Sequence, residues 1–189
     1  MNPRFSASLA VIAAVALAHG PTAHAEKGSQ PQVGAAAPDF ELPAVAGGRS
    51  GQVKLSEVTA KSDVVLVMLR GWPGYQCPLC SRQVGDFVKS AKAFSDKGAE
   101  VLLVYPGPAS QLSDKAKAFL RSSRLPKNFT MVTDPDYEMT QAYGLRWAAT
   151  RETAYPATFV IGTDGKISWS KISKSHGGRT NAKEVLAQL

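Results

Sequence analysis

The sequence predicts an α/β fold in which a central mixed β-sheet is flanked by helices on both faces. Two apolar runs of strand length, 64–69 and 101–105, alternate with segments of helical apolar spacing, and a strand that is apolar on both faces lies inside a sheet. Residues 158–161 and 166–172 form a hairpin around Thr163-Asp164-Gly165, which adds an antiparallel part. Strands and helices that alternate with short connections imply a layered sandwich.

The first half of the chain supplies the centre of this plan. Residues 47–51 are a turn between two short extended pieces, and 55–58 fit one helical turn. The central strand at 64–69 follows. A long helix is predicted next, because apolar residues recur on one face at Cys80, Val84, Phe87, Val88, Ala91 and Phe94. Gly98 is the expected end of this helix.

The second half repeats the alternation. The strand at 101–105 ends at Pro106-Gly107-Pro108, and a helix opens at Ser113-Asp114. A third strand covers 129–132, and a short helix covers 136–143. After the hairpin, a last helix at about 181–189 gives the order β-α-β-α-β-α-β-β-α.

The N-terminus divides the chain into three predicted regions. Residues 1–25 fit a cleaved signal peptide, because Arg4 precedes an apolar stretch and Ala23-His24-Ala25 matches a signal-peptidase site. That stretch is shorter than the roughly 20 residues that span a bilayer, so we expect export to the periplasm and no stable membrane insertion. Residues 26–36 should be a flexible lead-in, and 37–189 one domain.

The charge of the chain is modestly basic, with 22 Lys and Arg, 15 Asp and Glu, and a net charge of +7. No dense basic run with interleaved aromatic residues occurs, so nucleic acid is not an expected partner. Several basic residues near the end are interpreted as exposed surface positions: Lys166, Lys171, Lys174, Arg179 and Lys183.

The only two cysteines form Cys77-Pro78-Leu79-Cys80, where the central strand turns into a helix. This placement is typical of a thiol-redox centre. A structural disulfide is the alternative in an exported protein. A disulfide across so short a loop removes little entropy from the unfolded chain, which favours the redox interpretation.

The expected position of Cys77 is the N-cap of the helix, with Pro78 as the first helical residue. Free N–H groups and the positive end of the helix dipole should then lower the pKa of Cys77, and Cys80 should be less exposed. Cys77 would attack a substrate disulfide and Cys80 would resolve the mixed disulfide. Alternatively, a peroxide oxidises one cysteine and the other closes the disulfide.

Several short motifs follow one another along the chain, and their order and spacing together are informative: Ala37-Pro38-Asp39-Phe40-Glu41-Leu42-Pro43, Arg70-Gly71, Asp134-Pro135-Asp136, Ala142-Tyr143-Gly144-Leu145, Pro156-Ala157-Thr158-Phe159-Val160-Ile161 and Asp164-Gly165-Lys166-Ile167. Together they resemble the thioredoxin fold and, within it, the alkyl hydroperoxide reductase/thiol-specific antioxidant family of peroxiredoxin-like proteins. The resemblance covers 37–189. It implies a thioredoxin-like domain that acts on a protein disulfide or a peroxide, with an electron-donating thiol protein as partner.

Two departures from the family pattern concern the active site. The peroxiredoxin pattern runs from Pro73 to Cys80, but Cys77 stands at its Thr/Ser position. Pro156 stands where the family has an arginine and where thioredoxin-like reductases have a cis-proline. The resemblance therefore implies that Pro156 is cis and packs against the cysteine pair. Both departures favour thiol–disulfide exchange, with peroxide reduction as the alternative.

Other residues are candidates for supporting roles. Arg70 and Arg82 flank the cysteines and could lower a thiol pKa. Trp72 and Tyr75 could form an apolar rim, and the insert 72–76 has no assigned role.

A non-enzymatic alternative is copper binding by Cys77, Cys80 and His176, as in Sco-type chaperones. Those proteins have a C-x-x-x-C spacing and a histidine near the strand equivalent to 158–161, and this chain has neither. We expect no cofactor and no resident metal.

Overall fold

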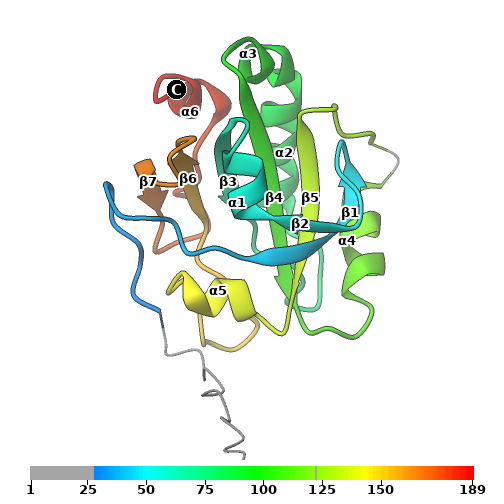
Figure 1. Cartoon of the computed structure of the whole chain (residues 1–189). Helices are drawn as coiled ribbons and strands as arrows, with labels where there is room; N and C mark the ends of the chain where they lie inside the picture. The colour runs from blue at the N-terminus through cyan, green and yellow to red at the C-terminus, as the bar shows by residue number, and fades with distance from the viewer. Residues whose placement is uncertain (1–27, 122) are drawn as a thin grey trace, which may run out of the picture.

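The computed structural model describes residues 28–121 and 123–189, which form a domain around a seven-stranded sheet (Figure 1). The predicted signal peptide lies outside these residues. The strands lie in the order β2-β1-β5-β4-β3-β6-β7, where β3, β4 and β5 are parallel and the others pair antiparallel. Their bounds are β1 Glu41–Gly47, β2 Gln52–Lys54, β3 Asp63–Met68, β4 Ala99–Gly107, β5 Phe129–Pro135, β6 Ala157–Ile161 and β7 Ile167–Ile172.

The helices are α1 Leu55–Thr59, α2 Pro78–Lys89, α3 Ala91–Asp96, α4 Leu112–Leu120, α5 Glu138–Ala142 and α6 Ala182–Leu186. They cover both faces of the sheet, because successive side chains of a strand point to opposite sides. Val65 and Val67 of β3 pack in the cluster that contains buried residues of α2, α3, α4 and α6. Val64 and Leu66 pack in the cluster with α1 and α5. The predicted α/β sandwich is confirmed.

The helix predicted through Phe94 is two helices. Ser90, between α2 and α3, has φ −97° and ψ 11°, which is outside the α-helical region. Phe87 and Phe94 nevertheless face the same core, where their rings stack at 5.4 Å. The apolar stripe therefore identified the buried side correctly, but it carried no signal for the break.

Backbone contacts tie residues 28–36 to the domain. Gly34 N–H donates to Ile167 O at 2.8 Å, and Ile167 N–H donates to Ala35 O at 3.0 Å. The domain boundary at Ala37 stays a prediction. None of the helices in the described part of the chain is long and apolar enough to span a membrane.

A tightly held loop connects β3 to α2. Gly71 has φ +70°, and a Cβ there would lie 1.8 Å from Pro106 O at the end of β4, so only glycine fits this close approach. At the other end of the insert, the Gln76 amide donates to Lys115 O and accepts from the Tyr105 hydroxyl at 2.7 Å. The insert thus fixes the point at which the chain enters α2.

Candidate active site

Cys77 and Cys80 lie at the N-terminal turn of α2, as the sequence predicts. Cys77 is the N-cap residue, Pro78 is the first helical residue, and Cys80 N–H donates to the Cys77 sulfur at 3.3 Å. Arg70 N–H donates to the Cys80 sulfur at 3.4 Å. Both cysteines are free thiols, and they are only 3% and 1% exposed. Cys80 is slightly less exposed than Cys77, as predicted, but both sulfurs are buried.

The two thiols have opposite tendencies to ionise. Hydrogen bonding from the Cys80 side chain, helped by the Cys80 N–H and the Arg179 charge, lowers the pKa of Cys77 to about 5 despite its burial. Burial, together with the hydrogen bond to Cys77, raises the pKa of Cys80 above its ordinary value. At neutral pH the pair therefore holds a thiolate at Cys77 and a thiol at Cys80.

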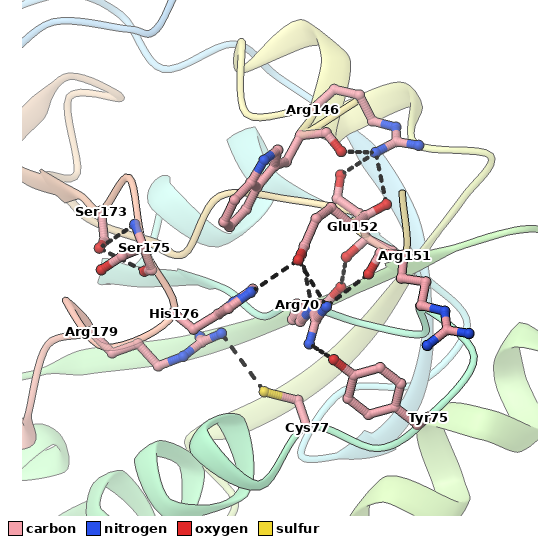
Figure 2. Close-up of polar contacts among 12 residues, drawn as sticks. Arg70, Tyr75, Cys77, Arg146, Arg151, Glu152, Ser173, Ser175, His176 and Arg179 are labelled. Carbon is pink, nitrogen blue, oxygen red and sulfur yellow. Dashed lines mark hydrogen bonds and ion pairs between the residues drawn. The ribbon is translucent and has the colours of Figure 1, made fainter. Parts of the chain in front are cut away.

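Arg179 is a site residue that the sequence interpretation missed, because it was placed among exposed basic positions. Its Nη2 lies 3.9 Å from the Cys77 sulfur (Figure 2). Its Nη1 donates to Gln83 Oε1 at 3.2 Å. Gln83 is fixed in turn by hydrogen bonds from its amide to Thr180. The segment before α6 thus places a cation beside the Cys77 sulfur.

Arg70 and Tyr75 lie near the cysteines but face each other. The Arg70 side chain is 6% exposed, and its guanidinium pairs with Glu152 at 3.0 Å and contacts the Tyr75 hydroxyl. Only the backbone of Arg70 reaches a cysteine. The Tyr75 ring is exposed and lies against the Arg70 guanidinium at 4.8 Å.

The other residues that the sequence predicted for the site are Trp72, Pro73, Arg82 and Pro156. Pro73 and Trp72 are half-buried in the loop before α2, and Arg82 is exposed on α2. The prediction of a cis-proline at 156 is wrong, since no described residue follows a cis peptide bond. Pro156 follows a trans peptide bond and directly precedes β6, and its carbonyl accepts from Ser173 N–H at 2.8 Å, so it joins the backbone pairing of β6 with β7.

Two hollows flank the N-terminal half of α2. One of about 350 Å³ is lined by residues that include Gln76, Pro78 and Val84. The other, of about 220 Å³, is lined by residues that include Gln83, His176 and Arg179. Neither cysteine lines either hollow, but Gln76 and Pro78, the neighbours of Cys77 in the sequence, line the first, and Arg179, which contacts the Cys77 sulfur, lines the second.

His176 was a candidate copper ligand, and the structure pairs it with Glu152 at 3.0 Å. Among residues 28–121 and 123–189, no three His, Cys, Asp or Glu side chains gather so that they could hold a metal ion.

The model of the AhpC/TSA family matches residues 33–170, which is most of the domain. The chain belongs to the AhpC/TSA family. Membership confirms the resemblance drawn from the motifs, and it makes this protein a thiol oxidoreductase. It also supports the peroxide-reducing alternative better than the thiol–disulfide exchange that the two departures favoured.

Solved structures agree with this AhpC/TSA assignment. AhpC of Mycobacterium tuberculosis matches with TM-score 0.67 and 20% identity over 84% of this chain and 95% of its own. AhpC of Mycobacterium bovis matches with TM-score 0.67 and 22% identity over 83% and 89%. A reduced 2-Cys peroxiredoxin of Plasmodium vivax matches with TM-score 0.65 and 21% identity over 82% and 78%. These similarities show the shared thioredoxin-like fold. No curated protein sequence matches the chain.

Proposed function

We propose that this AhpC/TSA-family protein reduces peroxides, with Cys77 as the attacking sulfur and Cys80 as the resolving thiol. The observation that carries the proposal is the burial of Cys77, which is 3% exposed. A peroxide is small enough to reach such a sulfur through a narrow opening. Attack on the disulfide of a folded protein, in contrast, requires the Cys77 sulfur to lie at the surface.

The reaction follows from the opposite ionisation of the two thiols. The Cys77 thiolate attacks one oxygen of the peroxide, an S–O bond forms and the O–O bond breaks. The other oxygen takes up a proton and leaves as an alcohol or water. Cys80 then loses its proton and attacks the Cys77 sulfenic acid, so that an S–S bond forms and water leaves. An external thiol reductant returns the two electrons.

Arg179 supports this direction of attack. Its guanidinium lies 3.9 Å from the Cys77 sulfur, and during the attack negative charge moves from this sulfur to the departing oxygen. Cationic donors already in place at such a position stabilise the transition state without reorganisation. Arg179 can thus supply the charge that the family pattern expects at the position of Pro156.

Thiol–disulfide exchange is the second candidate. It is favoured by the second cysteine at the Thr/Ser position of the family pattern, which makes Cys77-Pro78-Leu79-Cys80 a dithiol pair of the kind that exchanges with disulfides. This function requires Cys77 to become exposed when a partner binds.

Stopped-flow mixing of the reduced protein with hydrogen peroxide or an organic hydroperoxide tests the proposal, with tryptophan fluorescence and free-thiol counts as readouts. We expect rapid loss of both thiols in the wild type and no disulfide in Cys77→Ser. Oxidation no faster than that of free cysteine at the same pH, together with rapid reduction of a protein disulfide, would establish exchange instead.

We further propose that the protein acts after export, on the strength of the residue pattern at 1–25. Expression of the full chain in a bacterium, followed by N-terminal sequencing of the periplasmic fraction, tests this. A product that starts at Glu26 supports the proposal, and an uncleaved chain in the cytoplasm contradicts it.

A further inference from the structure

A partly buried cluster of Arg70, Glu152 and His176 lies next to the cysteine pair, but none of its charged groups contacts either sulfur. Glu152 sits at its centre, with its side chain 14% exposed. It accepts from Arg70 Nε at 3.1 Å and pairs with Arg70 Nη2 at 3.0 Å. On its other side, His176 Nε2 donates to Glu152 Oε1 at 3.0 Å. Figure 2 shows this chain of contacts between Arg70 and the segment that carries Arg179.

The cluster joins two segments that each contribute to the redox pair. Arg70 follows β3, and its N–H holds the Cys80 sulfur. His176 belongs to the segment after β7, and three residues further along that segment Arg179 reaches the Cys77 sulfur at 3.9 Å. Glu152 is therefore the link between the fixed end of β3 and the segment that delivers the cation.

Aromatic packing holds His176 in the same place. Trp147 lies between two rings, with its centroid 4.9 Å from that of His176 and 4.7 Å from that of Tyr155. Stacked aromatic pairs at such distances are favourable beyond the area that they bury. The carboxylate and the indole thus fix the imidazole from two directions.

We propose that Glu152 is a positioning residue, which keeps the Arg179 guanidinium on the Cys77 sulfur by holding His176. The inference rests on the proposed role of Cys77 as the reacting sulfur. Its test needs no peroxide, however, because ionisation of Cys77 is measured directly by the thiolate absorbance at 240 nm during a pH titration.

The sign of the effect separates positioning from simple charge. Removal of the Glu152 carboxylate leaves the Arg70 cation unpaired, and direct electrostatics would then favour the thiolate and lower the pKa of Cys77. Loss of positioning has the opposite result, because Arg179 moves away from the sulfur. We expect Glu152→Ala to raise the first thiol pKa by about one unit, which is tenfold less thiolate at a pH below both values.

Two further variants sharpen the test. Glu152→Gln is also neutral but keeps an oxygen that can accept from His176, so its rise should be smaller than that of Glu152→Ala. If only the loss of the Glu152 charge mattered, the pKa of Cys77 would shift equally in both variants. In a background of Arg179→Met, which has already lost the cation, Glu152→Ala should add no further rise, as expected for two residues that act through one contact.

Glu100→Ala is the matched control, since Glu100 also pairs with an arginine, Arg49 at 2.7 Å, but at the start of β4 and away from the cysteines. It should leave the thiol titration unchanged. If Glu152→Ala does not fold, His176→Ala replaces it, because that side chain is 32% exposed and its loss leaves the Arg70–Glu152 pair intact.

An unchanged or lowered Cys77 pKa in a folded Glu152→Ala or His176→Ala protein overturns the inference, whatever the substrate is. Failure of the wild type to reduce peroxide would overturn the proposed function alone, since the thiol titration would still report on positioning.

Discussion

The two cysteines should differ sharply in reactivity when each is left alone in the protein. Cys80→Ala leaves Cys77 as the single thiol, and Cys77→Ala leaves Cys80. In the first variant Cys77 loses the side-chain hydrogen bond that lowers its pKa most, but it keeps the N–H of residue 80 and the Arg179 charge. In the second variant, burial still suppresses ionisation of Cys80. Cys77 should therefore react with both alkylating agents and peroxide, and Cys80 with neither at a comparable rate.

The magnitude follows from the thiolate fractions. With a pKa of about 5, Cys77 in the wild type is about 99% thiolate at pH 7. If loss of the hydrogen bond raises this pKa to about 7, half of the thiol is still ionised. An ordinary cysteine is only about 3% thiolate at this pH, and Cys80 lies below that. The Cys80→Ala protein should thus be alkylated at least about 10-fold faster than the Cys77→Ala protein.

The assay is iodoacetamide alkylation at pH 7 followed by mass spectrometry, with dimedone trapping of sulfenic acid after a peroxide pulse. Trapped sulfenic acid should be found on Cys77 in the Cys80→Ala protein. Equal rates in the two variants, or sulfenic acid only on Cys80, would refute the reasoning from burial and hydrogen bonding. Sulfenic acid only on Cys80 would instead assign the attack to Cys80, the last residue of the peroxiredoxin pattern.

Four more outcomes are expected. The peroxide rate of the wild type should be flat from about pH 6.5 to 8 and should fall as the pH drops through about 5, because protonation removes the Cys77 thiolate; stopped-flow rates over this range check it. Gly71→Ala should lower the free energy of unfolding by at least about 2 kcal/mol, since its Cβ would meet Pro106 O. Gly85→Ala, in α2 with no atom near the added Cβ, should raise it by roughly 0.5–1 kcal/mol, and urea titrations measure both. Asp134→Ala should cost about 2–3 kcal/mol in the same assay, because the buried carboxylate accepts three hydrogen bonds at the start of α5.

The fold could be predicted from the sequence because its signals are local. An apolar run such as 64–69 reports burial on both faces, and the spacing from Cys80 to Phe87 reports one side of a helix. The N-cap position of Cys77 was also predictable, since a cysteine before Pro78 at a strand end leaves few other arrangements. Each of these inferences needs only neighbouring residues.

Arg179 could not be found in the same way, because its partner is Cys77, more than half of the chain away. Its sequence neighbours are small or polar and typical of an exposed loop. What brings it to the site is the docking of α6 on α2, through Gln83 with Thr180 and through Ala182 N–H, which donates to Asp86 at 2.7 Å. The cis-proline at 156 was predicted from the resemblance at a single position, and the trans bond there contradicts it.

The arrangement of charge around the two cysteines favours Cys77 over Cys80 as the reacting sulfur. The peroxiredoxin pattern ends on Cys80, but burial and the hydrogen bond with Cys77 raise the pKa of that thiol. The cysteine at the Thr/Ser position has the N-cap, the free N–H groups and the cation. Position 156 has no charge to offer, and Arg179 approaches from the other end of the chain toward Cys77. These contacts support the proposal that the reacting sulfur is Cys77, three residues before the family position, and that Cys80 is the resolving thiol.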